Sequence, residues 1–194
     1  MITITKVFTD YEMARRAVQE LEARGIPSAD ISLIANEHVS DLHDDVEETS
    51  SSATGAGVGA VVGGTAGLLT GLGLLAIPGL GPVVAAGWLV TTALGAVAGG
   101  ATGGLLGALV GAGVPEDHAH VYSEAVRRGG TLLSVKTADT NEVTVNTVVN
   151  RHLPIDPDLQ GEEYRSSGWS TFDPAAAPYT PDQTRREANR RPGL

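Results

Sequence analysis

One long stretch without charge constrains the fold of this chain more than any other feature. From Thr49 through Pro115 no Asp, Glu, Lys or Arg occurs, and 19 of the 25 glycines of the chain lie there. Residues four apart lie on one face of a helix, so glycines at every fourth position predict helices with a glycine track. Two such series occur: Gly55, Gly59, Gly63, Gly67 and Gly71, and then Gly95, Gly99, Gly103, Gly107 and Gly111.

The two series predict an antiparallel glycine-zipper helical hairpin over 55–113, with helices over 55–76 and 83–113. Each glycine costs a helix about 1 kcal/mol relative to alanine, so ten of them cost roughly 10 kcal/mol. Close approach of helix backbones is the available compensation, and we expect it between copies of the chain. A turn over 77–82 is indicated by Pro78, Gly79, Gly81 and Pro82.

Both predicted helices are apolar on every side, and such helices are buried in protein or in lipid. Each is long enough to cross the ~30 Å hydrocarbon core of a bilayer. One expectation is therefore a hairpin in the inner membrane with both termini in the cytoplasm. The alternative is a cytoplasmic homo-oligomer whose hairpins share a core, because Gly, Ala and Thr dilute the hydrophobicity and the flanks lack the Lys/Arg bias of membrane spans.

The segments on either side of this stretch have the pattern of a small α/β unit. Before it, Ile2–Phe8 and Ile31–Ala35 are predicted strands, joined by a helix that begins after Asp10 and ends before Gly25. Strands joined in this way are normally parallel neighbours. After it, a helix (PEDHAHVYSEAVRRGG), a strand (TLLSVKT) and a second helix (NEVTVNTVVNRH) are predicted.

These elements predict an α+β fold, in which a small ferredoxin-like βαβ…αβα layer with helices on one face is interrupted by the glycine-zipper hairpin. An extended C-terminal tail, rich in Pro and polar residues, follows. The expected domains are 1–36 as the first half of the layer, 37–54 as an acidic linker, 55–113 as the hairpin, 115–152 as the second half and 153–194 as the tail.

The tail carries aromatic residues that a plain solubilising segment does not need. Trp169, Phe172 and Tyr179 are candidates for docking on a neighbouring surface. A solubilising tail without docking is the alternative. Four arginines near the C-terminus are candidates to pair with the acidic segment 41–48: Arg185, Arg186, Arg190 and Arg191.

Composition excludes several classes of function. The 13 basic and 23 acidic side chains give a net charge of −10, which opposes binding to nucleic acid. The absence of cysteine excludes disulfides, Cys-ligated zinc, iron–sulfur clusters and thiol catalysis. The N-terminus lacks the basic and apolar regions of a signal peptide. We identify no catalytic residue, cofactor or small-molecule substrate, and we expect a non-enzymatic protein.

Three motifs match known sites only formally. Gly55–Ala60 fits G-x-G-x-x-[GA], but it follows an acidic, Ser-rich linker rather than a strand, and no acid occurs in the next fifty residues. His118 and His120 are two apart, so on a helix they point to different faces and are interpreted as surface residues. The third motif is a group of potential metal ligands, which we interpret as a solvated linker rather than a metal site: His38, Asp41, His43, Asp44 and Asp45.

Several segments resemble a known family. VFTDYEMARRAVQELEARGIPSADISLIA resembles the opening of the general stress protein 17M-like (YflT-type heat-induced stress protein) family. AIPGLGPV, GVPEDHAHVYSEAVRRGGTLLSVKT and GWSTFDPAAAPYT resemble its long branch, which carries a glycine-rich hairpin. The resemblance implies a role in the bacterial stress response and supplies no catalytic residue. We therefore expect a stress-associated protein that self-assembles through the hairpin at or in the inner membrane, or alternatively a soluble homo-oligomeric scaffold or binding protein.

Overall fold

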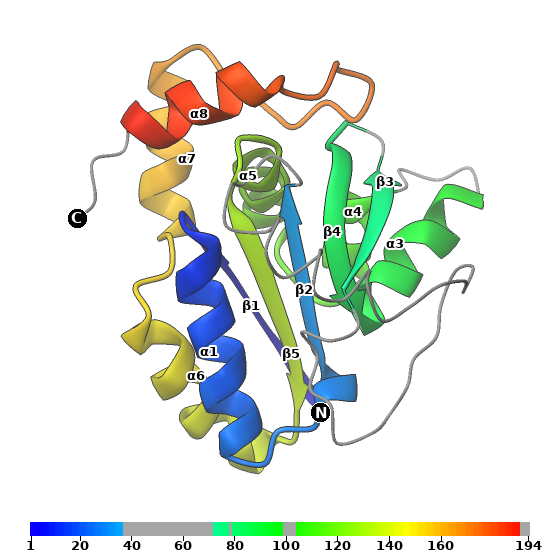
Figure 1. Ribbon diagram of the computed structural model, residues 1–194, viewed down its shortest axis with the longest axis vertical. Coiled ribbons are helices and arrows are strands. Elements are labelled where there is room, and N and C mark those ends of the chain that lie inside the picture. Colours follow the sequence, from blue (N-terminus) through cyan, green and yellow to red (C-terminus); the bar gives the residue numbers. More distant parts are fainter. Residues whose placement is uncertain (37–71, 78, 99–103, 191–194) are drawn as a thin grey trace, which may run out of the picture.

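A five-stranded sheet forms the centre of the protein. The computed structural model describes residues 1–36, 72–77, 79–98 and 104–190 (Figure 1). The strand order is β1-β5-β2-β4-β3, and each strand is antiparallel to the strand beside it. The strands are β1 (Ile2–Phe8), β2 (Ile31–Asn36), β3 (Gly73–Ile77), β4 (Gly81–Gly87) and β5 (Thr131–Thr137).

The first two strands share a direction but are not neighbours. Both β1 and β2 are antiparallel to β5, which lies between them, so β1 and β2 run parallel. Val135 of β5 is opposite Ile4 on one side and opposite Ile31 on the other. The predicted pairing of the two strands is therefore wrong. The second half of the layer inserts its strand into the first half.

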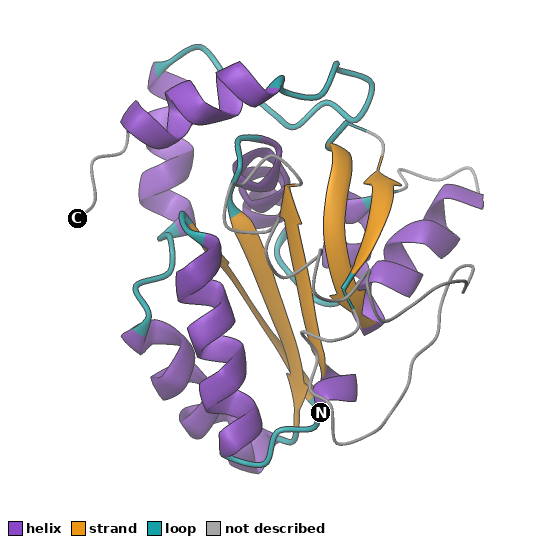
Figure 2. Cartoon of the chain, in the orientation of Figure 1, coloured by secondary structure: helices purple, strands orange, loops and turns teal. Residues whose placement is uncertain are grey.

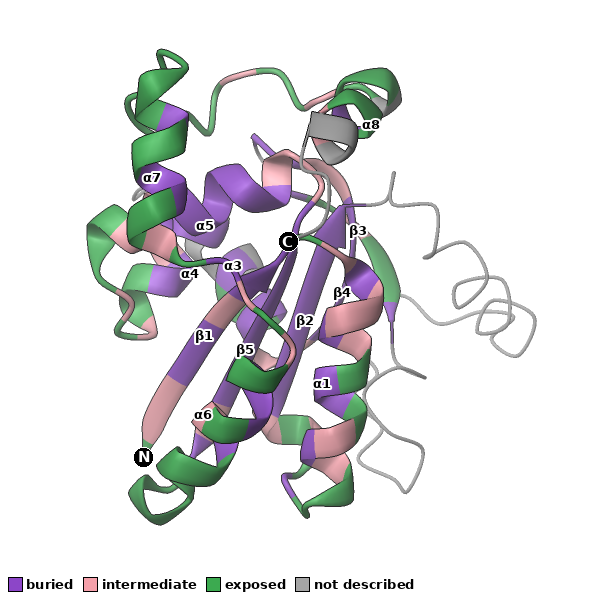
Figure 3. Ribbon diagram, turned by 90° about the vertical axis from the view of Figure 1, so that its left-hand side faces the viewer, coloured by how far each residue is buried: buried purple, intermediate pink, exposed green. Residues whose placement is uncertain are grey.

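Helices cover both faces of the sheet, and the expectation of helices on one face is wrong (Figures 2 and 3). On one face α1 (Tyr11–Ala23) and α6 (Glu142–Arg151) enclose a first core with alternate strand residues. On the other face a second core lies beneath three helices. They are α3 (Trp88–Ala98), α4 (Leu105–Gly111) and α5 (Glu116–Arg127). Two short 3-10 turns, η1 (Ser28–Asp30) and η3 (Asp139–Asn141), precede β2 and α6.

Local signals placed the flanking elements correctly. The Asp10 carboxylate accepts a hydrogen bond from the Glu12 backbone N–H at 2.7 Å and begins α1, as predicted. Gly25 has a φ of 85° just after that helix, as its predicted role requires. The predicted helices and strand between 115 and 152 are confirmed as α5, β5 and α6.

The predicted helical hairpin is wrong where the structure describes it. Residues 73–77 and 81–87 form β3 and β4, a β-hairpin that extends the sheet beyond β2. The sheet gives these backbones hydrogen-bond partners, and Val83 and Val84 favour strand geometry. Of the predicted helix 83–113, residues 83–87 belong to β4, α3 and α4 are helical, and 99–103 lie outside the described residues. Residues 55–71, with the first glycine series, lie outside the described residues.

The tail also differs from the prediction. Instead of an extended segment, it contains α7 (Pro157–Ser166) and α8 (Pro181–Arg190). Asp156 accepts hydrogen bonds from the backbone N–H groups of Asp158 and Leu159, at 2.9 and 3.2 Å, and so begins α7. Proline at the next position suits the first turn of a helix, since its missing N–H has no partner there in any case.

The end of β4 lies directly against β2. Gly87 has a φ of 98°, and a Cβ added there would meet the Ile31 carbonyl oxygen and approach the Ser32 Cα atom to 2.6 Å. The Ser32 hydroxyl donates to the Ala86 carbonyl at 2.9 Å. Only glycine allows the two backbones to come this close, so the β-hairpin depends on this position for its place in the sheet.

We expect Gly87→Ala to lower the free energy of unfolding by about 3 kcal/mol, because positive φ and a backbone clash act together. Gly25→Ala is the matched control, since Gly25 also has a positive φ but has open space where a Cβ would be added. It should lose only about 1–2 kcal/mol. Urea unfolding followed by circular dichroism measures both, and equal losses would contradict the close approach.

A cluster of charges joins α1 to α6. Glu20 Oε1 lies 2.9 Å from Arg24 Nη2 and 2.6 Å from Arg151 Nη1, and Glu20 Oε2 lies 3.0 Å from His152 Nε2. The hydrogen bond with His152 lowers the pKa of Glu20 most; burial opposes this effect, and the two arginines add to the lowering. The carboxylate form of Glu20 therefore stabilises the contact between the helices.

The cluster predicts a defined dependence of stability on pH. A carboxyl group with a lowered pKa stabilises the fold above its ordinary pKa of 4.5, and this contribution is lost as pH falls through the folded-state pKa. Wild type should therefore exceed Glu20→Gln in urea midpoint at pH 6, and the difference should vanish in stronger acid. Equal midpoints at pH 6 would show that the cluster contributes nothing.

Candidate functional site

The described part of the uncharged stretch gathers on the β3 side of the sheet (Figure 1). Its inward residues, Leu80, Leu89 and Leu109, are fully buried in the second core. Its outward residues include Leu74, which is 57% exposed, and Val110, which is 43% exposed. The stretch therefore both completes the core of its own chain and presents an uncharged surface.

The structure locates part of the second glycine series. Gly95 lies within α3, whereas Gly99 and Gly103 lie outside the described residues. Gly107 is half-buried in α4, which packs against α3. Gly111 is exposed at the end of α4, with nothing within 4 Å of an added Cβ. Gly111 therefore makes no close contact with another described helix of its own chain, although a glycine zipper requires one.

The structure has a turn within the predicted range 77–82, but this turn joins the strands β3 and β4 instead of two helices. It lies against the tail. Gly79 and Gly81 have φ values of 77° and 81°, and Pro82 belongs to β4; Pro78 lies outside the described residues. A Cβ added at Gly79 would lie 2.7 Å from the Pro174 Cα atom. The tail segment that links α7 to α8 thus rests on the tip of the β-hairpin.

A buried carboxylate organises the contact between the tail and the body. Glu124 of α5 is fully buried, and its Oε2 atom lies 2.7 Å from Arg127 Nη2. Its Oε1 atom accepts from Arg128 Nε at 2.6 Å, and Arg128 Nη1 donates to Glu187 of α8 at 2.9 Å. Burial lowers the pKa of Arg128, but the hydrogen bonds to Glu124 and Glu187 outweigh this effect and raise it.

Aromatic rings of the tail complete this cluster. Arg128 lies 4.2 Å from the centre of the Tyr164 ring, and Arg127 lies 5.1 Å from the Tyr179 ring and 5.9 Å from the Phe172 ring. Such contacts are favourable because the ring faces carry partial negative charge. We name the group Glu124, Arg127, Arg128, Tyr164, Phe172, Tyr179 and Glu187 the tail clamp.

The three aromatic residues singled out in the tail contact the body of their own chain. Phe172 is buried in the second core, and Tyr179 is half-buried beside Arg127 and Arg128. Trp169 packs partly buried against the second core, and it lies edge-on to Tyr164 of α7 with 5.6 Å between ring centres.

Sequence reasoning missed both tail helices and the buried carboxylate. One available signal was a capping box: Thr180 Oγ1 accepts from the Gln183 N–H at 3.3 Å, and Gln183 Oε1 accepts from the Thr180 N–H at 2.9 Å. A second was the spacing of Glu124 to Arg127 and Arg128, which favours ion pairs on one helix. Nothing local indicated that Glu187 would join them.

The two histidines of α5 also contact the tail. His118 Nε2 lies 3.0 Å from Asp158 Oδ1, and His120 Nδ1 lies 2.9 Å from the Thr171 hydroxyl. Burial raises the pKa of the neighbouring Tyr122 to about 12, and the carboxylates of Asp156 and Asp158 add to it. These contacts join α5 to α7.

Within the described ranges no group of three potential metal ligands occurs. His38, Asp41, His43, Asp44 and Asp45 lie outside those ranges, as do the acidic segment 41–48, Arg191 and the glycine motif 55–60. Arg185 pairs with Asp182 of its own helix at 2.8 Å.

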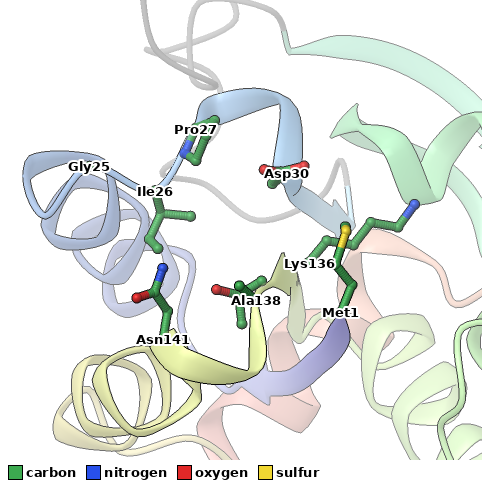
Figure 4. Close-up of a pocket in the computed structure, with 9 residues that line it drawn as sticks. Met1, Gly25, Ile26, Pro27, Asp30, Lys136, Ala138 and Asn141 are labelled. Carbon is green, nitrogen blue, oxygen red and sulfur yellow. The ribbon is translucent and has the colours of Figure 1, made fainter.

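A shallow pocket of about 260 Å³ lies at the end of the sheet next to the N-terminus (Figure 4). Lys136 Nζ sits 3.8 Å from the centre of the Trp88 ring, and the amino group of Met1 lies 3.2 Å from Asp139 Oδ1. Both cations thus already contact groups of the chain, and Asp30 adds a carboxylate to the lining. Its lining is Met1, Gly25, Ile26, Pro27, Asp30, Lys136, Thr137, Ala138 and Asn141.

In the part of the chain that the structure describes, no helix has the length and apolarity needed to cross a bilayer. Comparisons with protein-family models, with curated proteins and with solved structures find no match to this chain.

The tail clamp predicts different effects for its two carboxylates. Glu124→Gln should lower the free energy of unfolding by about 3 kcal/mol, because it leaves buried guanidinium groups without their central partner. Glu187→Gln should lower it by about 1–2 kcal/mol and speed amide hydrogen exchange in 181–190. Arg185→Gln, which removes an exposed pair on the same helix and keeps the carboxylate of its first turn, is the control and should change neither readout. Unchanged exchange in Glu187→Gln would contradict the clamp.

Proposed function

We propose that this chain is a non-enzymatic protein that assembles with copies of itself through the uncharged stretch 49–115. The observation that carries this proposal is the exposure of Leu74 on β3 and of Val110 on α4, two apolar residues in a stretch that contains none of the 13 basic and 23 acidic side chains of the chain. Copies with a net charge of −10 repel one another over most of their surface, and this effect weakens where charge is absent.

The glycine series supports the same proposal. Small residues let helices of different chains approach closely and gain dispersion energy. Gly111 is exposed and has open space around it, which suits a contact made with another molecule rather than within the chain. In this proposal the glycine-zipper contact is intermolecular, and the ten glycines of the two series contribute to it.

We favour assembly without a two-span membrane hairpin. Residues 73–77 and 81–87, which a two-span hairpin requires in or next to its helices, are strands of the central sheet. A hairpin at or in the inner membrane remains an outcome that the experiment below separates from a soluble homo-oligomeric scaffold.

The resemblance to the general stress protein 17M-like family extends the proposal to a role in the bacterial stress response. This extension requires that the abundance of the protein rise when the source bacterium is stressed, and constant abundance under heat, cold and osmotic shock would contradict it.

We also propose that the layer is ferredoxin-like, which β5 between the parallel strands β1 and β2 supports. An experimental structure in which β1 pairs directly with β2 would contradict this relationship.

Self-association predicts a particle larger than the 19.9 kDa chain. We expect light scattering coupled to gel filtration to show an oligomer without detergent. Gly63→Leu and Gly103→Leu should each lower the mass of this particle with an unchanged circular dichroism spectrum. Val143→Leu, at a position 76% exposed on α6, is the control and should keep the oligomer.

Each result has a definite meaning. A wild-type monomer at every concentration, with or without detergent, would overturn self-association. The wild-type particle mass in both glycine variants would remove the glycine contact. A protein that requires detergent to leave the membrane fraction would support the membrane alternative.

A further inference from the structure

The two edges of the sheet differ in how they are protected. At the β1 edge, the Val7 carbonyl accepts a hydrogen bond from the Ile155 N–H at 2.7 Å, so the tail occupies part of that edge. Lys6 adds a charge to the same strand. Coverage and lysine are both means by which proteins prevent an edge strand from pairing with another chain.

Among the residues that the structure describes, none of these devices protects the β3 edge over the strand Gly73–Ile77. The strand GLLAI contains no charge and no proline. Gly73 and Ala76 are exposed, and Leu74 is 57% exposed. Because Gly73 has no side chain, its exposure means that the backbone itself reaches the surface. Figure 3 shows β3 largely in the colour of exposed residues.

We propose that β3 pairs with β3 of a second copy in antiparallel orientation, with a twofold axis at Leu75. This inference rests on the proposed self-association and specifies its contact. In this register Leu75 lies opposite Leu75 of the second copy, Leu74 opposite Ala76, and Gly73 opposite Ile77. The central sheet is antiparallel throughout, so the pairing continues the same ladder across the axis.

The side chains fit this register on both faces of the sheet. Leu75 packs partly against the second core, so the two Leu75 side chains extend that apolar layer from one copy to the other. On the opposite face, the large exposed Leu74 meets the small Ala76, and cross-strand pairs of this kind stabilise sheets. A shift of one residue would turn the second copy over, so that Leu74 would lie opposite Leu75 instead of the small Ala76, and it is disfavoured.

A second copy is the occupant that the charge distribution favours. An uncharged strand does not attract a cationic or an anionic partner. The β3 strand of a second copy is also uncharged, has the same length and has the same alternation of side chains as the strand it would pair with. The twofold register needs five residues and places no charged residue of either β3 at the axis.

Single cysteines test the register, because the chain contains no natural cysteine. Residues directly opposite in an antiparallel pair have Cα atoms about 4.5–5.5 Å apart, within the about 4.4–6.8 Å span of a disulfide. Under mild oxidation Leu75→Cys should become mostly covalent dimer on a non-reducing gel. Leu74→Cys and Ala76→Cys alone should yield at least about fivefold less, and a mixture of these two should cross-link with each other. Val143→Cys is the exposed control on α6.

The outcomes separate this inference from the proposed function. If sedimentation shows an oligomer but Leu75→Cys cross-links no faster than Val143→Cys, β3 pairing is wrong and self-association stands. Equal cross-linking of Leu75→Cys and Leu74→Cys would also overturn the register. A wild-type monomer at every concentration would overturn both proposals.

A charge placed at an exposed position of the edge gives a second test of the pairing. Ala76→Lys should reduce the yield of the Leu75→Cys cross-link at least about fivefold, because a lysine on an edge strand opposes pairing. Val143→Lys in the same background is the matched control and should leave the yield unchanged. Equal yields with the two lysines, in proteins with wild-type circular dichroism spectra, would contradict edge-to-edge contact.

Discussion

The position of β5 between β1 and β2 is the constraint on which the rest of the structure depends. These two strands lie close together in sequence and share a direction, yet each forms its ladder with a strand that follows more than ninety residues later. The first 36 residues therefore cannot complete a sheet alone. The chain on either side of the uncharged stretch must meet before β1 and β2 have hydrogen-bond partners, and the entropy of closing such a loop rises only slowly with its length.

This constraint also explains the place of β3 and β4. With β5 on one side of β2, the other side of β2 is open to a further strand, and β4 occupies it from Ser32 to Asn36. The uncharged stretch thus does not simply leave the domain and return, because part of it becomes sheet. The contact is close enough at Gly87 that any side chain would strike the backbone of β2. The uncharged stretch and the elements that flank it therefore share both cores of the protein.

Local signals in the sequence were sufficient for the elements that flank the stretch. Asp10 and Gly25 mark the ends of α1 by mechanisms that act within a few residues, and the apolar periodicity of α1 and α5 fixes their buried faces. The β-hairpin was not predicted, because glycines at every fourth residue suggested helix and outweighed Val83 and Val84. The order of strands and the helices on both faces depend on contacts between distant segments, which one sequence does not display. The contact of Glu187 with the tail clamp is also a contact between distant segments, and the sequence does not indicate it. The helix N-caps at Asp156 and Thr180 are local signals, but the prolines around them favoured the prediction of an extended tail.

The glycines of this protein fall into two groups with different physical roles. Spacing along the sequence alone does not separate the glycines that the backbone of the β-hairpin requires from those on the surface of a helix. At Gly79 and Gly87 the backbone has positive φ, and atoms of the tail or of β2 lie where a Cβ would be. These glycines are required by the β-hairpin and say nothing about helix packing. Gly111 lies on a helix with free space around it, so neither backbone conformation nor an internal contact requires glycine there. Under the proposed self-association, a second copy would supply the contact at Gly111 and at the exposed Leu74 of the β3 edge, which none of the described residues makes.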